Sequence, residues 1–127
     1  MPWLNFIAVG SGAALGAWLR WGLGIALNPL FPTVPMGTLT ANLLGGFIIG
    51  VTMSVDEPLG FPPALRLLIT TGFLGGLTTF STFSAEIVTL ALRAQYAWAA
   101  GAAALHLAGS LGLTGLGVLL AKHYLSS

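Results

Sequence analysis

The sequence predicts an all-α membrane protein with four transmembrane helices in a single domain that covers residues 1–127. Two observations support this prediction. Only 6% of the 127 residues are charged, whereas soluble domains average about 25%. The hydrophobic residues, which make up 56% of the chain, gather in four apolar runs, and each run reaches the roughly 20 residues needed to cross a bilayer.

The composition also excludes several classes of protein. So few charges cannot cover the surface of a soluble fold, which excludes a soluble enzyme and a nucleic-acid-binding protein. The runs lack the alternation of apolar and polar residues that marks the strands of a membrane β-barrel. The chain contains no cysteine, so disulfides and zinc–thiolate sites are excluded as well.

Breaks rich in proline or charge separate the four runs. We expect the helices at about residues 3–27, 35–54, 64–92 and 96–121. Asn28-Pro29 ends the first helix, an acidic turn at Asp56-Glu57-Pro58 ends the second, and Pro62-Pro63 precedes the third. After the fourth helix, Lys122-His123-Tyr124 is typical of an anchor at the membrane interface.

The basic residues are balanced between the two sides of the membrane. Arg66 and Lys122 fall on the side of the N-terminus, and Arg20 and Arg93 fall on the other side. Lys/Arg bias sets the orientation of membrane proteins, so this balance predicts insertion in both orientations and an antiparallel dimer of identical chains. Four helices alone enclose little room for a transport pathway through the membrane, which also favours an oligomer.

Three helices carry small or polar residues at a spacing of four, which places each row on one helix face. The rows are Gly12, Gly16, Arg20 and Gly24; Thr38, Asn42, Gly46, Gly50 and Ser54; and Ala102, His106, Ser110 and Thr114. Such rows are typical of contacts between membrane helices. At Asn42, His106 and Ser110 the alternative is a wet path, because a polar side chain at membrane depth needs a partner or water.

The third helix contains poor helix-forming residues near its centre. Gly75-Gly76 is followed by the β-branched pair Thr78-Thr79. We expect a break at these glycines at mid-membrane, which would free backbone carbonyls to line a cavity or coordinate an ion. The alternative is a straight helix that uses its glycines for close packing.

Two phenylalanines lie just after this segment among hydroxyl side chains. Phe80 and Phe83 are interleaved with Ser81, Thr82 and Ser84. The edge of an aromatic ring is electropositive, so ring edges and hydroxyls together would bind an anion weakly enough to release it, as conduction requires. The alternative is that both rings serve only for packing.

Two charged residues of the helices are open to two interpretations. Arg20 lies between Trp18 and Trp21, as in an interfacial anchor, or it raises the positive potential at a pore mouth. Glu86 lies one turn beyond Phe83 and makes either a polar contact at a helix end or part of a vestibule.

Three segments together resemble the Fluc/CrcB family of bacterial fluoride channels, and the resemblance covers essentially the whole chain. The first two are Gly-Ala-Trp-Leu-Arg-Trp at 16–21 and Gly-Thr-Leu-Thr-Ala-Asn-Leu-Leu-Gly at 37–45. The most specific is Gly-Phe-Leu-Gly-Gly-Leu-Thr-Thr-Phe-Ser-Thr-Phe-Ser at 72–84.

The resemblance implies a non-enzymatic, multi-pass protein of the bacterial inner membrane. It implies a dual-topology homodimer whose two antiparallel pores export cytoplasmic fluoride passively. Phe80 and Phe83 would line the pores and Asn42 would contact the ion, whereas other residues would lie in or near the polar pathway: Ser81, Thr82, Ser84, His106 and Ser110. Arg20 would lie at a vestibule, and the carbonyls of Gly75 and Thr78 from both subunits would hold a central structural sodium ion.

Two other classes are less consistent with the residues. Small multidrug-resistance exporters are also short four-helix proteins, but they couple drug and proton movement through an acidic residue in the first helix. The only charged residue in this first helix is Arg20. A non-transporting assembly subunit would leave the polar third helix unexplained.

Overall fold

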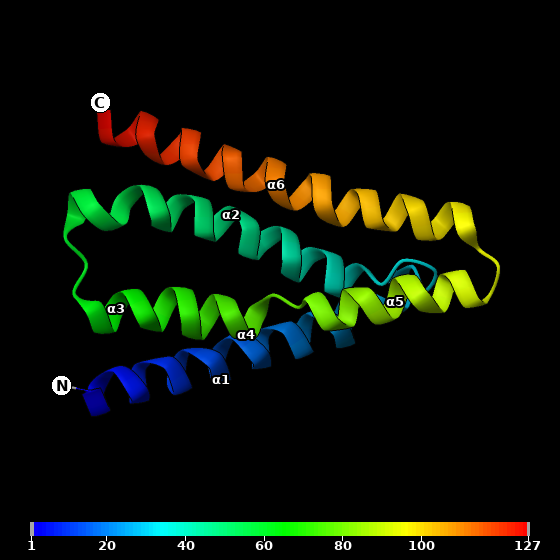
Figure 1. Ribbon diagram of the computed structural model, residues 1–127, viewed down its shortest axis with the longest axis horizontal. Coiled ribbons are helices and arrows are strands. Elements are labelled where there is room, and N and C mark those ends of the chain that lie inside the picture. Colours follow the sequence, from blue (N-terminus) through cyan, green and yellow to red (C-terminus); the bar gives the residue numbers. More distant parts are fainter. Residues whose placement is uncertain (1, 127) are drawn as a thin grey trace.

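The computed structural model describes residues 2–126, and the regular elements within that range are all helices (Figure 1). The first helix, α1 (Pro2–Leu27), is followed by the short 3-10 helix η1 (Asn28–Leu30) and by α2 (Met36–Leu59). The third span is a series of shorter elements: α3 (Pro63–Leu67), the π-helix η2 (Leu68–Leu74), α4 (Gly75–Leu77) and α5 (Phe80–Leu92). The last helix, α6, covers Tyr96–Ser126.

The helices run side by side along the long axis of the molecule. Figure 1 shows the N-terminal end, the C-terminal end and the link between α2 and α3 at one end of the bundle, with the link between α5 and α6 at the opposite end. This arrangement agrees with the predicted grouping of Arg66 and Lys122 on one side.

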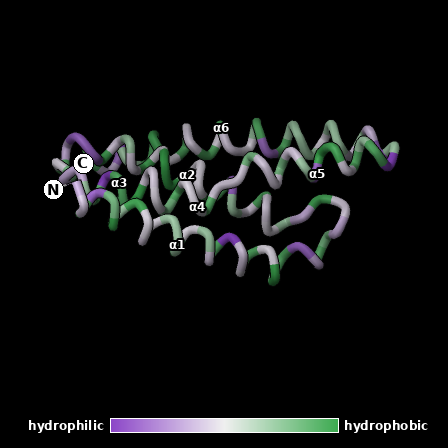
Figure 2. Tube along the Cα trace, turned by 60° about the horizontal axis from the view of Figure 1, so that its bottom comes forward, coloured by the Kyte–Doolittle hydropathy of each residue, from purple (hydrophilic) through white to green (hydrophobic). Residues whose placement is uncertain are grey.

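Three helical stretches are long and apolar enough to cross a membrane: Met36–Leu59, Pro63–Leu92 and Tyr96–Ser126. Hydrophobic residues line most of the length of α6 (Figure 2). The remaining predicted span, the first along the chain, forms α1 with nearly the predicted bounds. Its 26 residues are enough to cross a bilayer. Its hydropathy is lower because it contains Asn5, Arg20 and several glycines. These features make the chain an integral membrane protein.

Glycines allow the helices to approach closely. A Cβ atom on Gly16 would lie 2.0 Å from the carbonyl oxygen of Phe73, and one on Gly76 would lie 2.3 Å from that of Ala13. Between α2 and α6, a Cβ on Gly50 would lie 2.1 Å from the Thr114 carbonyl oxygen. Real Cβ atoms do not approach this closely, so the glycine rows are helix contacts, as predicted.

The break in the third span is confirmed, but its predicted position at Gly75-Gly76 is wrong. Gly75 is helical, with φ −62° and ψ −38°, whereas Thr78 (φ −84°, ψ 154°) and Thr79 (φ −149°, ψ 115°) are extended. Of the two, Gly76 packs directly against Ala13 and Ala17 of α1, which holds this part of the third span in the helical conformation. The β-branched threonines adopt the extended conformation that suits their side chains.

Two predicted helix ends are also wrong. The second helix was expected to end at Ser54, but α2 continues through the acidic residues to Leu59, where left-handed Gly60 (φ 64°) ends it and donates to the carbonyls of Asp56 and Glu57. Arg66 Nε donates to Asp56 Oδ2 at 2.6 Å and so holds this last turn against α3. The fourth helix continues beyond residue 121 to Ser126.

Candidate functional site

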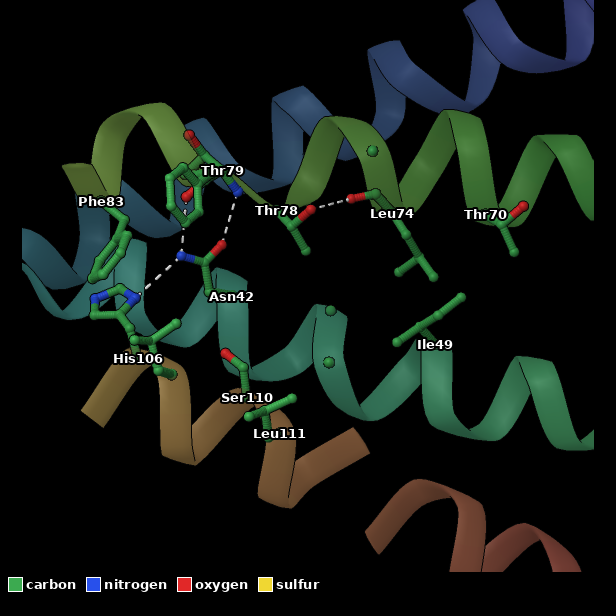
Figure 3. A pocket seen from close by; sticks show the side chains of 15 residues that line it. Asn42, Ile49, Thr70, Leu74, Thr78, Thr79, Phe83, His106, Ser110 and Leu111 are labelled. Atoms are coloured by element: carbon green, nitrogen blue, oxygen red, sulfur yellow. Dashed lines mark hydrogen bonds between the residues drawn. The ribbon is translucent and has the colours of Figure 1, made fainter. Parts of the chain in front are cut away.

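Asn42 of α2 holds the break in the third span. Its Oδ1 accepts a hydrogen bond from the Thr79 backbone N–H at 2.8 Å, and its Nδ2 donates to the Thr79 carbonyl at 3.1 Å (Figure 3). The carboxamide therefore replaces the hydrogen bonds that the interrupted helix cannot make. Buried backbone groups need such partners, above all within a membrane.

His106 of α6 completes this cluster. Its Nδ1 lies 3.1 Å from Asn42 Nδ2, and only 4% of the residue is exposed. The imidazole packs against the Phe83 ring, with 4.6 Å between the ring centroids. Phe83 in turn meets Phe80 in an edge-on contact, with centroids 5.5 Å apart. Three helices, α2, α5 and α6, thus bring the predicted aromatic and polar residues together.

A cavity of about 510 Å³ lies beside this cluster and opens to the outside of the chain. Predicted site residues form much of its wall: Asn42, Gly75, Thr78, Phe80, Phe83, His106 and Ser110. None of the residues lining it, all of them within the described range, is Asp, Glu, Lys or Arg. Figure 3 shows polar side chains from α2, α6 and the break on its wall beside apolar ones. Of the two phenylalanines on this wall, Phe80 is 74% exposed in the single chain, whereas Phe83 is only 8% exposed.

The predicted hydroxyl residues of α5 have other surroundings. Thr82 donates its backbone N–H to the Thr79 hydroxyl oxygen at 3.1 Å, and the Thr79 hydroxyl donates to the Thr82 side chain at 3.0 Å. Ser81 Oγ lies 3.4 Å from the same Thr79 hydroxyl. These contacts cap the start of α5. Ser84 is half-buried and lines neither this cavity nor the two smaller cavities beside Arg20 and Glu86.

Arg20 contacts the third span just before the break. Its Nε donates to the Gly76 carbonyl at 3.1 Å, which ties α1 to the end of α4. The residue also lines a second cavity, of about 300 Å³, together with Thr38, Thr79 and Thr82. Arg20 therefore does not serve only as an interfacial anchor, because it also binds the third span and lines a cavity.

Glu86 lies close to these cavities. The Thr38 hydroxyl donates to Glu86 Oε2 at 2.6 Å, so the carboxylate is held between α2 and α5. Glu86, Thr82 and Arg93 line a third cavity of about 320 Å³. This geometry combines the two interpretations of Glu86, because the residue makes a polar contact and also lines a cavity.

Two residues of the site, Thr79 and Thr38, were not among the predicted site residues. Thr79 contributes a backbone N–H, a carbonyl and a capping hydroxyl. Its signal in the sequence was the β-branched pair after two glycines, which predicted a break but no role for a particular side chain. Thr38 lies four residues before Asn42, on the same polar row of α2.

The break removes the usual helical donors from the carbonyls of Gly75 and Thr78. In a continuous helix the Thr79 N–H would donate to Gly75, but it donates to Asn42 instead. Likewise, the Thr82 N–H would donate to Thr78, but it donates to the Thr79 hydroxyl. The described residues contain no group of His, Cys, Asp and Glu side chains suited to a metal ion.

Comparison with known proteins agrees with these features. Residues 7–118 match the sequence model of the family described as "CrcB-like protein, Camphor Resistance (CrcB)". A protein of Nitrosospira multiformis named "Fluoride-specific ion channel FluC" is 60% identical over 116 residues, which cover 91% of each chain. Proteins of the same name from Burkholderia cenocepacia and Dechloromonas aromatica are 53% and 56% identical, over 97% and 91% of this chain and 97% and 87% of their own. The chain therefore belongs to the CrcB-like family.

Proposed function

We propose that this chain forms a fluoride-selective channel that exports cytoplasmic fluoride passively. The observation that carries the proposal is the cavity at the break, whose largely apolar wall includes two phenylalanines and several uncharged polar residues but no charged side chain. The names of the relatives from three bacterial genera support it. A proton-coupled multidrug exporter is not favoured, because α1 carries no acidic residue.

The wall of the cavity suits an anion that must bind weakly and leave quickly. Phe80 and Phe83 offer electropositive ring edges, and the positive end of the α5 dipole begins at Phe80 beside them. Asn42, His106 and Ser110 add polar groups to the same wall, and Ser81, Thr82 and Ser84 follow along the first turns of α5. Fixed dipoles of this kind favour an anion without trapping it. The positive charge of Arg20 in the neighbouring cavity raises the local anion concentration.

The working unit in this proposal is an antiparallel homodimer with two pores. The cavity opens to the outside of a single chain, yet extended backbone and polar side chains line it. Polar groups at membrane depth are costly beside lipid, which supports a second protein surface over this cavity. A second copy in the opposite orientation meets this need and agrees with the balance of basic residues between the two sides.

The carbonyls of Gly75 and Thr78 are the proposed ligands of a structural sodium ion. Gly75 and Thr78 would each contribute one backbone oxygen from each of the two subunits, which gives the uncharged oxygen donors that suit a hard monovalent cation. The ion would have a structural role, because it would join the two breaks at the dimer interface. The proposed location is the inner membrane of a bacterium.

The fluoride proposal predicts a specific ion flux. Purified protein in liposomes loaded with potassium fluoride should release fluoride when valinomycin carries potassium out, because only an anion pathway then limits the efflux. Liposomes loaded with potassium chloride should show efflux at the level of protein-free liposomes. Chloride efflux as fast as that of fluoride would contradict selectivity, and no flux of either ion would contradict a channel.

The dimer proposal predicts labelling from both sides of the membrane. The chain has no cysteine, so Ser126→Cys introduces a single thiol at the end of α6. In sealed proteoliposomes or cells, an impermeant maleimide should label about half of the chains from one side, and the rest should become accessible only after permeabilisation. Complete labelling from one side would reject dual topology.

A further inference from the structure

The hydrogen bonds of Asn42 determine the state of its neighbour His106. The Thr79 backbone N–H can only donate, so the Asn42 atom that it contacts at 2.8 Å is the oxygen Oδ1. The other atom of the amide is then Nδ2, which can only donate. Its contact at 3.1 Å is the Nδ1 of His106, so this ring nitrogen must be an unprotonated acceptor.

The surroundings of His106 agree with a neutral ring that carries its proton on Nε2. Among the described residues the ring contacts Asn42 from α2 and Phe83 from α5, and neither is charged. Among residues 2–126, no carboxylate oxygen lies within 4.0 Å of the imidazole nitrogens, because the single ion pair in that range joins Arg66 to Asp56. The acidic residue of α5, Glu86, is engaged by the Thr38 hydroxyl. A doubly protonated ring would direct an N–H at the Asn42 N–H.

This arrangement uses both N–H groups of the Asn42 amide. One donates to the Thr79 carbonyl at 3.1 Å and the other to His106. Without the acceptor on α6, the second N–H would be unpaired in the interior of the bundle, and only the contacts with Thr79 would orient the amide. An anion that took either N–H would first have to displace Thr79 or His106.

We infer that His106 is a positioning residue, a neutral Nε2–H tautomer that accepts a hydrogen bond from Asn42 and so keeps the amide on both backbone groups of Thr79. Through Asn42 and Thr79 it fixes the start of α5, and with it Phe80. This inference rests on the proposed channel function for its consequence in transport. The tautomer itself does not depend on that function.

Two substitutions separate this role from simple packing. His106→Gln keeps an acceptor oxygen but removes the ring, whereas His106→Phe keeps a ring of similar size against Phe83 but removes the acceptor. Fluoride efflux should fall about tenfold or more in His106→Phe, the factor expected when a buried N–H loses its partner. It should stay within about threefold of the original rate in His106→Gln, because one hydrogen bond is re-formed.

Every other pattern of flux would overturn the inference. An active His106→Phe with an inactive His106→Gln would show that the ring serves packing. Equal loss in both variants would show that the imidazole is needed for some other property, and unchanged flux in both would show that it is not needed.

The tautomer can be measured without any flux. The chain contains two histidines, so protein labelled with ¹⁵N-histidine gives two sets of ring signals, and a His123→Asn variant identifies those of His106. We expect Nδ1 of His106 to resonate as an unprotonated nitrogen and Nε2 as a protonated one at neutral pH. A protonated Nδ1 would overturn the inference even in a working channel. Absent fluoride flux with the expected tautomer would instead refute the proposed function.

Discussion

Replacing Asn42 with leucine should lower fluoride efflux by about two orders of magnitude, because three groups lose their partner at once. The Thr79 N–H, the Thr79 carbonyl and His106 Nδ1 all bond to this one side chain. A buried polar group left unpaired costs about 1–3 kcal/mol, and about 1.4 kcal/mol corresponds to a factor of ten. The loss of two backbone partners alone therefore predicts a factor of about 100 or more in the population of the intact break.

The measurement is fluoride efflux from liposomes, with size-exclusion chromatography to follow the assembly. The matched control is Thr52→Val on the same helix, because the Thr52 hydroxyl donates only to the Ile48 carbonyl within α2. The control should retain flux within about twofold, since this hydroxyl bond adds little to the helix. Normal flux in Asn42→Leu would mean that the break needs no side-chain support.

Substituting isoleucine for Phe80 or Phe83 should reduce fluoride efflux at least tenfold while the protein stays assembled. The two rings meet edge-on, and Phe83 also packs on His106. Isoleucine keeps most of the apolar volume but has no electropositive edge, so it removes the attraction for an anion. We expect the larger effect at Phe83, which is 8% exposed and touches both other rings.

A phenylalanine remote from the cavity provides the control for this experiment. Phe6 is 82% exposed on α1, so Phe6→Ile should leave efflux unchanged. Size-exclusion chromatography should give the same elution for all three variants. Unchanged efflux in both Phe80→Ile and Phe83→Ile would remove the aromatic rings from the pathway and leave them a packing role.

Much of the fold was predictable because membrane helices follow local rules. A helix must satisfy its own backbone hydrogen bonds in a bilayer, so the length of each apolar run and the prolines around it predict its approximate bounds. The bounds of α1 and the ends of the third span were predicted closely. The end of α2 was not, because the contact between Asp56 and Arg66 that holds its last turn joins residues ten positions apart.

Part of the site was predictable for the same reason. Residues that share a helix face, such as Phe80 and Phe83, or the polar row that contains Asn42, have a relative position set by helix geometry alone. The partners of Asn42 could not be predicted in this way. Thr79 is 37 residues from it and His106 is 64 residues from it, and helix periodicity says nothing about contacts over such distances.

The sequence by itself determined the class of this protein: a membrane-embedded helical chain with few charges and a weak point in its third span. Only the tertiary structure decided where that weak point breaks. Gly75 and Gly76 have the lower helix propensity, yet both stay in the helix, and Gly76 packs directly against α1. Thr79 leaves it because Asn42 satisfies its N–H and its carbonyl. A helix at membrane depth can open only where another element supplies the missing hydrogen bonds.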